Sequence, residues 1–411
     1  MQFFIIDNDT IVEQSSILLA QAGHHIKTAA SLQSNDDALE KIVNFQPDIV
    51  LCDVLFPKIN SFELFQHLRD TKNIKQPKFI ITSSQFSADQ HKYAAELAID
   101  GYIVKTDNLE YFTEKLIEII FNKITIQFWG CRGTLPVPGQ KSLRYGGNTN
   151  CVTFRTTNKN FFEDFFIFDA GSGIKELSNY LLKENKLPID AKIFISHPHY
   201  DHINGLPYFV PFYMKDNFFE ILGARHGELT IEKIIAGQMD SVYFPVTTKE
   251  FLANITYRNL TEETFAINEL QISTILLNHP GRCLGYRIKY KKKIFCYITD
   301  NELFFENSPF YNQHEIERLI TFISHANILI IDATYTDEQY IKKIGWGHSC
   351  VSRVVDIADK AKVKLLCLHH HDPDQTDDDI DAKLSLARSL LQFRHSHTHC
   401  IVAHEKDEIL I

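Results

Sequence analysis

The sequence of 411 residues lacks the features that direct a protein into a membrane or out of the cell. It has no apolar run close to the roughly eighteen residues that a membrane span needs. The opening "MQFFIID" reaches an acid at position 7, which is unlike a signal peptide. The eight cysteines are scattered singly without a CxxC pair, a pattern typical of reduced thiols. We therefore predict a soluble, cytoplasmic protein with no membrane partner.

An excess of basic charge is also missing. The 42 Lys and Arg residues against 52 Asp and Glu residues give a formal net charge of −10. Such a chain is poorly suited to gripping long nucleic acids by their phosphates. The one basic run, "KYKKK" at 289–293, lies between two strand-like segments, and we interpret it as a solvated hairpin turn. A nucleic-acid polymer is therefore not the expected partner.

The length exceeds what one hydrophobic core usually serves, and a change of pattern near residue 122 predicts two domains, 1–122 and 123–411. In the first part, short apolar runs such as "PDIVLCD" (47–53) and "KFIITSS" (78–84) alternate with segments of helical periodicity such as "SFELFQHLRD" (61–70). This alternation predicts an α/β fold with a doubly wound parallel sheet.

Working groups gather at the carboxyl ends of the strands in such sheets. The groups expected at that edge are Asp7, Asn8, Asp9, Asp53, Thr82, Ser83 and Lys105. They include what a carboxylate needs to accept a phosphoryl group: acids that hold a divalent cation, a hydroxyl, and a lysine that pairs with the phosphoryl oxygens. Together with "DVLFPKINSF" (53–62), this set resembles the receiver domain of response regulators.

The resemblance covers about the first 120 positions and implies a phosphoacceptor at Asp53, bound Mg²⁺, a cognate sensor histidine kinase and a switch aromatic at Tyr102. Two positions depart from the family pattern. Asn8 replaces the second of two adjacent acids, and Thr106 replaces a proline. The alternative hypothesis is a receiver-like module that docks or dimerises without taking up phosphate.

The segment 107–124 carries apolar residues at helical spacing and runs into "TIQFWG" with no Gly, Ser or Pro spacer. We predict a helix joined directly to the second domain. A rigid connection of this kind transmits a movement that a flexible linker would absorb.

A dense group of polar residues follows the apolar run that ends at residue 195. "ISHPHYDH" (195–202) presents His197, His199, Asp201 and His202 within six positions. Burying such groups together is costly unless they bind a metal. Residues two apart in an extended segment point the same way, so His197 and His199 can hold one ion while Asp201 and His202 face a second. The sequence therefore predicts a metal site.

Further metal-binding residue types close other strand-like runs, namely His279, Asp300 and the triplet His369–His371. This order resembles the metallo-β-lactamase superfamily, which implies an αββα fold from about residue 125 to the end and a dinuclear site. The resemblance assigns His197, His199 and His279 to the first metal, Asp201, His202 and His370 to the second, and Asp300 to both. His369 and His371 remain alternatives to His370. The resemblance also implies that Asp169 orients the ligand loop, and the expected ions are Zn²⁺ or Mn²⁺.

The segment "GWGHSCVSRVVDIADKAKVKLLCLHHHDP" (345–373) resembles the branch of the superfamily that contains tRNA 3′-end-processing endonucleases and small-molecule phosphodiesterases. By this resemblance His348 opens a helix and acts as a general acid. We expect catalysis to depend on Asp201 and His348. Arg132 and Asn148, in glycine-containing segments, are expected to contact the substrate.

These features predict a two-component response regulator whose output is a dinuclear phosphodiesterase acting on a small signalling nucleotide, such as a cyclic nucleotide. The alternatives are a tRNA-type endonuclease, an ester, thioester or lactone hydrolase, and a non-catalytic sensor that binds its ligand at the metal site. An aromatic-rich insert (207–246) forms a pocket wall, a homodimer surface or part of the core. Sequence patterns do not separate these three.

Overall fold

The computed structural model describes residues 1–29, 31–121, 124–158 and 160–411. The chain divides into two compact units. The first unit comprises Met1–Lys123 with Thr156–Glu163, and the second comprises Ile124–Arg155 with Asp164–Ile411. After the expectations drawn from the sequence, we call them the receiver unit and the hydrolase unit. The predicted domain boundary at 122 and 123 lies outside the described residues. No helix in the described part of the chain has the length and apolar character to cross a membrane.

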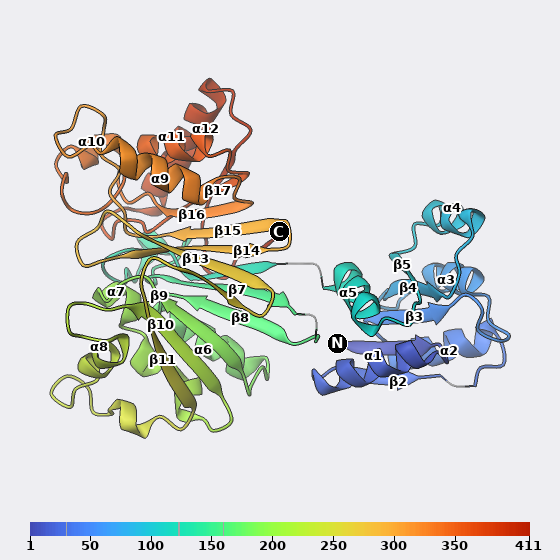
Figure 1. Cartoon of the computed structure of the whole chain (residues 1–411). Helices are drawn as coiled ribbons and strands as arrows, with labels where there is room; N and C mark the ends of the chain where they lie inside the picture. Colours follow the sequence, from blue (N-terminus) through green and yellow to red (C-terminus); the bar gives the residue numbers. More distant parts are fainter. Residues whose placement is uncertain (30, 122–123, 159) are drawn as a thin grey trace. The chain divides into compact units, whose positions relative to one another are not determined.

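The receiver unit contains one parallel sheet with the strand order β2-β1-β3-β4-β5 (Figure 1). Its strands are β1 (Gln2–Ile6), β2 (His25–Thr28), β3 (Ile49–Asp53), β4 (Lys78–Ser83) and β5 (Gly101–Val104). Its helices are α1 (Thr10–Gln21), α2 (Asn35–Phe45), α3 (Ser61–Asp70), α4 (Ala88–Glu96) and α5 (Leu109–Ile120). Helices α1 and α5 share one core cluster with the sheet, and α2 and α3 share the other. The predicted doubly wound fold is confirmed.

The helix expected over 107–124 is shorter than predicted. Asn108 caps its start by accepting a hydrogen bond from the backbone N–H of Tyr111, and α5 ends at Ile120. Phe112, Leu116 and Ile120 are buried against the sheet, as the helical spacing predicts. Residues 122 and 123, the last part of the predicted connection, lie outside the described residues.

The hydrolase unit contains two seven-stranded sheets, with the orders β11-β10-β9-β8-β7-β6-β19 and β12-β13-β14-β15-β16-β17-β18. The first sheet comprises β6 (Thr125–Gly130), β7 (Cys151–Thr157), β8 (Glu163–Phe168), β9 (Asp190–Ile195), β10 (Phe218–Ala224), β11 (Asn254–Leu260) and β19 (Glu408–Leu410). The second comprises β12 (Thr264–Ile267), β13 (Leu270–Leu276), β14 (Leu284–Tyr290), β15 (Lys293–Ile298), β16 (Ile328–Asp332), β17 (Leu365–His369) and β18 (His399–Val402). The basic run 289–293 forms the tight connection between β14 and β15, as predicted.

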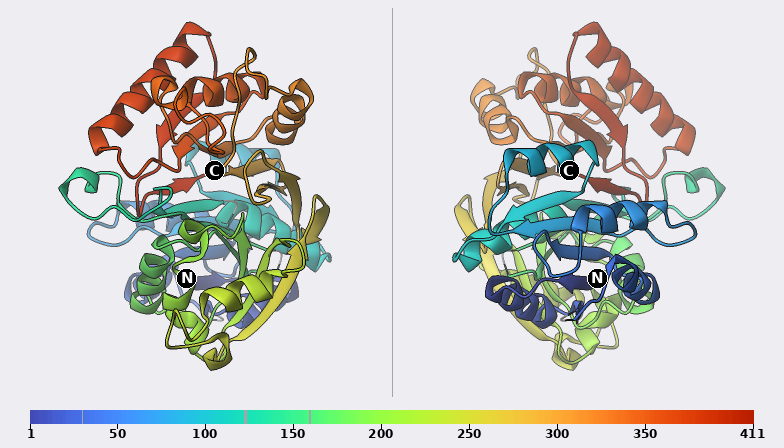
Figure 2. Two further views of the ribbon diagram at one scale, coloured as in Figure 1. Left: turned by 90° about the vertical axis from the view of Figure 1, so that its left-hand side faces the viewer. Right: turned by 90° about the vertical axis from the view of Figure 1, so that its right-hand side faces the viewer.

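Helices cover the outer faces of the two sheets, so the layers follow the αββα order (Figure 1). The helices are α6 (Gly173–Lys183), α7 (Tyr200–Ile203), α8 (Ile231–Gln238), α9 (Gln313–Ile323), α10 (Asp337–Tyr340), α11 (Val351–Lys360) and α12 (Asp377–Phe393). Short 3-10 turns occur at Gln140–Ser142, Leu206–Tyr208, Val210–Tyr213 and Thr248–Glu250. In the left view of Figure 2 the orange and red helices lie on one side of the strands and the green helices on the other.

The main core of the hydrolase unit lies between the two sheets. Phe154, Phe166 and Phe168 from the first sheet share one cluster with Tyr286 and Phe295 from the second. Phe168 stands 5.7 Å from Tyr286 and 5.1 Å from Phe295 between ring centroids. Such aromatic pairs bury a large area and fix the position of one sheet on the other. Because the sheets are held in place, the loops at the carboxyl ends of their strands are held in place as well. These loops carry the site residues.

Candidate functional site

The loop after β9 is held by one buried acid. Asp169 accepts hydrogen bonds through Oδ1 from the backbone N–H of Ser196 (2.7 Å) and through Oδ2 from His202 Nδ1 (2.8 Å) and the hydroxyl of Tyr297 (2.9 Å). Its side chain is fully buried and its φ of 56° is unusual for a non-glycine residue. These contacts fix both ends of the ligand loop, so the geometry fits the orienting role predicted for Asp169.

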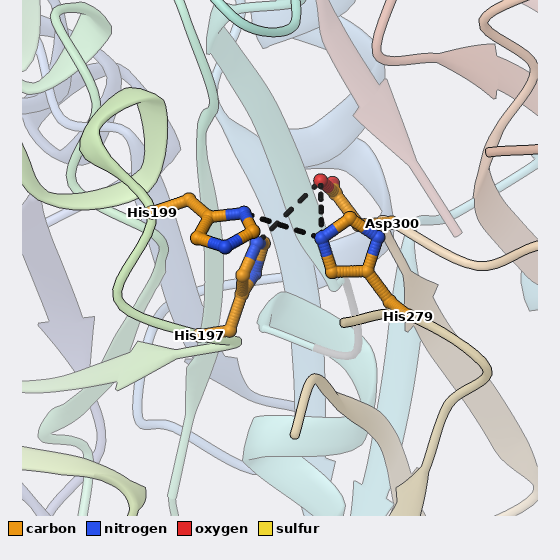
Figure 3. A group of neighbouring side chains, drawn as sticks. All are labelled: His197, His199, His279 and Asp300. Atoms are coloured by element: carbon orange, nitrogen blue, oxygen red, sulfur yellow. Dashed lines mark hydrogen bonds and ion pairs between the residues drawn. The ribbon is translucent and has the colours of Figure 1, made fainter. Parts of the chain in front are cut away.

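The first cluster consists of His197, His199, His279 and Asp300 (Figure 3). His279 Nε2 lies 3.2 Å from His199 Nδ1 and 3.6 Å from Asp300 Oδ2. His197 Nε2 lies 3.5 Å from the same carboxylate oxygen. His197 and His199 point to one place, as the extended spacing predicts, and the segments that follow β9, β13 and β15 each contribute to the cluster.

The second cluster consists of Asp201, His202, His370 and Asp300. Asp201 Oδ2 lies 3.1 Å from His202 Nε2 and 3.2 Å from His370 Nε2. Asp300 Oδ1 lies 3.2 Å and 3.0 Å from the same two nitrogens. One oxygen of Asp300 therefore faces the first cluster and the other faces the second, which is the arrangement of a carboxylate shared by two ions.

Of the three consecutive histidines, the structure brings His370 to the cluster and turns its neighbours away. The ring of His369 lies 3.1 Å from the carbonyl oxygen of Gly130, and His371 Nδ1 lies 2.9 Å from Lys383 Nζ. His370 adopts a φ of 59°, which breaks the alternation of the strand and rotates its ring out of the register of its neighbours.

The residues fit two divalent cations. Burial is the largest cause that lowers the pKa of His197, His199 and His279, so their neutral form is favoured, and this is the form that binds metals. His197 Nε2 is buried without a hydrogen-bond partner in the described residues, although an imidazole nitrogen at such depth needs one. Burial raises the pKa of Asp300, but the surrounding histidines outweigh it and keep this carboxyl ionised. A set of imidazoles with carboxylates suits Zn²⁺ and related ions.

His348 lies beside the two clusters rather than at the start of a helix, so that prediction was wrong. Helix α11 begins at Val351 with Cys350 as its cap, and His348 belongs to the loop before it. Its Nδ1 lies 2.9 Å from Asp332 Oδ2 and 3.9 Å from Asp300 Oδ2. Burial lowers the pKa of His348, but the two carboxylates outweigh this and raise it to about 9.

Asp332 is the site residue that the sequence reasoning missed. It is fully buried at the end of β16, and it forms a third group of potential ligands with His348 and His370. Its Oδ1 accepts a hydrogen bond from the Thr334 hydroxyl (2.6 Å). The signal was present, because "ILIID" (328–332) ends in an acid as "IFCYITD" (294–300) does, and parallel neighbours end at one edge.

Arg132 and Asn148 do not fit the substrate-contacting role predicted for them. Arg132 is fully buried, and its guanidinium lies 3.2 Å from an oxygen of Asp377 and 2.6 Å from the carbonyl oxygen of Gln375. Asn148 donates its side-chain N–H to Glu405 (2.9 Å). Both side chains are engaged by partners within the protein, Arg132 in a buried contact and Asn148 in a partly buried one.

A cleft of about 740 Å³ opens over the two clusters. Its walls contain His199, Asp201, His279, Asp300, His348 and His370 together with Thr134, Tyr200, Tyr335, Lys343, Trp346, Asp372 and Asp374. This volume lies in the range of small-molecule sites. The metal-ligating residue types are therefore accessible to a substrate of moderate size.

In the receiver unit, Lys105 Nζ lies 3.1 Å from Asp7 Oδ1, 3.1 Å from Asp53 Oδ2 and 3.5 Å from Asp9 Oδ2. Thr82 donates its hydroxyl to Asp7 (2.6 Å). Asn8 is exposed, whereas the side chain of Asp9 caps α1 by accepting from the N–H of Ile11. The structure thus brings together Asp7, Asp9, Asp53, Thr82 and Lys105, whereas the hydroxyl of Ser83 donates to the carbonyl oxygen of Gln85. Burial lowers the pKa of Lys105, but Asp7 and Asp53 outweigh it and raise the pKa.

Comparison with known proteins agrees with both units. A family model described as a response regulator receiver domain matches residues 3–117. The transcriptional regulatory protein AfsQ1 of Streptomyces coelicolor is 31% identical over 101 residues, which cover 25% of this chain and 42% of that protein. The receiver architecture is therefore established by sequence as well as by topology.

For the hydrolase unit, ribonuclease Z of Oceanobacillus iheyensis is 25% identical over 296 residues, which cover 59% of this chain and 90% of that protein. The crystal structure of the metallo-β-lactamase fold protein YhfI from Bacillus subtilis superposes with a TM-score of 0.50 and 17% identity, covering 70% of this chain and 100% of that chain. This structural likeness shows the fold alone. A family model described as a beta-lactamase superfamily domain matches residues 165–371, about half of the chain. The chain therefore belongs to the β-lactamase superfamily, with a response regulator receiver domain at its N-terminal end.

Proposed function

We propose that the hydrolase unit is a dinuclear metal-dependent phosphodiesterase that acts on a small signalling nucleotide, such as a cyclic nucleotide, under control of the receiver unit. The observation that carries this proposal is the division of Asp300, whose two oxygens face two separate groups of histidines. Three further ligands complete each group. Two adjacent cation sites are typical of enzymes that hydrolyse phosphoesters.

When bound, the two ions supply Lewis-acid stabilisation of the phosphoryl oxygens and an activated water for in-line attack. The remaining tasks belong to side chains. Thr134 donates its backbone N–H to Asp201 Oδ2 (2.8 Å), which holds that carboxylate toward the second cluster. His348 is the proton donor to the departing oxygen, because it lines the cleft and its other ring nitrogen is held by Asp332.

A small substrate is favoured over a polymer for two reasons. The chain carries a net charge of −10, and Asp372 and Asp374 add acidic side chains to the cleft wall. A phosphate backbone that continued past the cleft would meet this charge. The receiver unit also suits a signalling output. The second candidate function is an RNA endonuclease, which the similarity to proteins named ribonuclease Z supports.

A substrate screen tests the proposal. The full chain, loaded with Mn²⁺ or Zn²⁺, is incubated with cyclic mononucleotides, cyclic dinucleotides, bis(p-nitrophenyl) phosphate and a precursor tRNA with a 3′ trailer. We expect turnover of the model diester and of at least one cyclic nucleotide. Cleavage of the tRNA alone would favour the endonuclease, and hydrolysis of none of these phosphodiesters would overturn the proposal.

The matched variants for this screen are Asp201→Ala and Asp190→Ala. Asp201 stands in the second cluster, whereas Asp190 is an exposed acid at the opposite end of β9. Asp201→Ala should lose hydrolysis and metal content together. Asp190→Ala should retain both, because it changes the charge of the unit without changing the cleft.

A further inference from the structure

Two large aromatic side chains at the cleft are exposed to solvent. Tyr200 is 77% exposed and stands between the ligand positions His199 and Asp201. Trp346 is 58% exposed and precedes His348 by two positions. In the described residues neither ring has an aromatic stacking partner. Exposed aromatic rings beside a site are characteristic of surfaces that contact a ligand.

The exposure of Trp346 does not arise from a loose loop. The buried carboxylate of Glu302 accepts hydrogen bonds from the backbone N–H groups of Gly345 and Gly347, both at 2.8 Å. Gly347 has a φ of 84°, and a Cβ there would stand 2.3 Å from Nδ1 of His279. The backbone on both sides of Trp346 is therefore fixed against the metal cluster while the indole faces the solvent.

A cation lies over one face of this indole. Lys343 Nζ is 3.8 Å from the centroid of the Trp346 ring, and no carboxylate among the described residues forms an ion pair with it. Lysine over an indole face gains a cation–π interaction and remains able to attract an anion. Trp346 and Lys343 together thus offer a flat apolar surface beside a positive charge, which matches a nucleobase attached to a phosphate.

We propose that Trp346 and Tyr200 form the nucleobase-binding walls of the cleft and that Lys343 attracts the adjoining phosphate. The substrate is then a nucleotide with one or two bases rather than a simple alkyl phosphodiester. This inference rests on the proposed phosphodiesterase function for its substrate class. Base stacking on aromatic side chains is tolerant of sequence, because every base has a π-face.

Intrinsic fluorescence tests the binding step without turnover. The chain has two tryptophans, and Trp129 is only 3% exposed, so a change on ligand addition reports mainly Trp346. The full chain, with and without Mn²⁺, is titrated with adenosine 5′-monophosphate and with ribose 5-phosphate, which lacks the base. We expect saturable quenching by the nucleotide only. Equal responses to both ligands, or none to the nucleotide, would overturn the proposal.

Variants assign the response to the named residues. Trp346→Leu should remove the quenching, and Tyr200→Ala should weaken nucleotide binding about tenfold, the effect of losing one stacking contact. Tyr200→Phe should bind as the wild type does, because it keeps the ring. Phe393→Ala is the control, since Phe393 is 84% exposed but lies outside the cleft. A loss in Phe393→Ala equal to that in Tyr200→Ala would contradict the assignment.

Two esters with the same leaving group separate this inference from the proposed function. Thymidine 5′-(p-nitrophenyl phosphate) carries a nucleoside, and ethyl p-nitrophenyl phosphate does not. Tyr200→Ala and Trp346→Ala should each lower the ratio of kcat/KM for the nucleoside ester to that for the ethyl ester about tenfold. An unchanged ratio would mean that the two rings are not base-binding walls. If the wild type hydrolyses neither ester, the phosphodiesterase proposal fails, and the fluorescence titration still decides whether nucleotides bind.

Discussion

The acidic site of the receiver unit and the candidate metal site of the hydrolase unit both lie at the carboxyl ends of parallel strands, yet their carboxylates are neutralised in different ways. In the receiver unit, Asp7 and Asp53 share the ammonium group of Lys105. In the hydrolase unit, every ion-pair partner of Asp300 among the described residues is a histidine. Oxygen ligands beside a lysine suit Mg²⁺ and a transferable phosphoryl group, whereas imidazoles suit Zn²⁺.

The pKa values of two buried lysines also differ according to the groups around them. The pKa of Lys105 is raised, because Asp7 and Asp53 outweigh its burial. Burial lowers the pKa of Lys383 to about 7, and its ammonium contacts the carbonyl oxygens of Ala333 and Thr334 together with His371. Burial alone therefore does not determine the charge of a lysine. The difference teaches that partner groups act together with depth to set the charge of a buried lysine.

The largest effect is expected when one carboxylate is removed from the receiver site or from the candidate metal site. Asp300→Asn should lose bound metal and lower turnover at least about 10²-fold, because even groups that only support ligands cost 10–100-fold. Metal content by mass spectrometry and hydrolysis of bis(p-nitrophenyl) phosphate measure this. Asp53→Asn should retain both properties, since Asp53 belongs to the receiver unit. A metal-replete, active Asp300→Asn would contradict the shared-carboxylate assignment.

The second prediction separates proton donation from metal binding. His348→Ala should keep its metals but lose about 10²–10⁴-fold in turnover of alkyl phosphodiesters, whose leaving oxygen needs a proton. Its loss on a p-nitrophenyl ester should be much smaller, because p-nitrophenolate leaves unprotonated. Asp332→Asn should show the same substrate dependence in weaker form. Equal losses on both substrates would show that His348 positions the substrate instead, and loss of metal would make it a ligand.

The third prediction tests whether the receiver site accepts phosphate. With acetyl phosphate and Mg²⁺, intact mass should show one added phosphoryl group on the wild type and none on Asp53→Asn. The Asn8→Asp variant should be phosphorylated at a lower Mg²⁺ concentration than the wild type, because the substitution adds a carboxylate oxygen as a ligand. Phosphorylation should change turnover by about fivefold or more if the units are coupled. Absence of labelling would leave the receiver as a docking module.

Local patterns predicted much of the fold and of the candidate site. The alternation of apolar runs and helical periodicity predicted the receiver sheet, although no apolar run marks β2, because "HIKT" (25–28) is largely exposed. The spacing of "HPHYDH" (197–202) placed four candidate ligand residues in one loop, and residues that close strands supplied the rest. These signals are local, or they follow from the rule that parallel strands end at one edge.

Contacts distant in sequence were not predictable in this way. The run "ILIID" (328–332) brings Asp332 to the strand edge, but its contact with His348 joins residues from two separate segments of the chain. Arg132 pairs with Asp377, which lies 245 positions away, so the residues next to Arg132 in the sequence do not indicate that it is buried. His348 was expected to open a helix, but Cys350 adopts the extended cap conformation and α11 begins after it. Tertiary partners, not local propensity, decide these three positions.

The smallest predicted effect sharpens the contrast between the imidazoles of the two clusters and one that lies outside them. His24 lies in the receiver unit, with ring centroids 5.6 Å from both Phe3 and Phe121. Burial, followed by the N-terminal ammonium, lowers its pKa to about 4. As the pH falls, His24 therefore takes up a proton near pH 6.5 in the unfolded chain but only near pH 4 in the folded chain. His24 therefore does not reduce the free energy of unfolding above pH 6.5, and it reduces this free energy increasingly as the pH falls toward 4.

His24→Phe keeps an aromatic ring but cannot take up a proton. Between pH 7 and pH 5 the wild type should lose roughly 1 kcal/mol more unfolding free energy than the variant, a value reduced for the partial exposure of His24. Urea titrations followed by circular dichroism measure the difference. Between pH 7 and pH 8 the two proteins should change alike, because His24 is neutral in both states there. Parallel curves from pH 7 to pH 5 would show that His24 is solvated enough to titrate as it does in the unfolded chain.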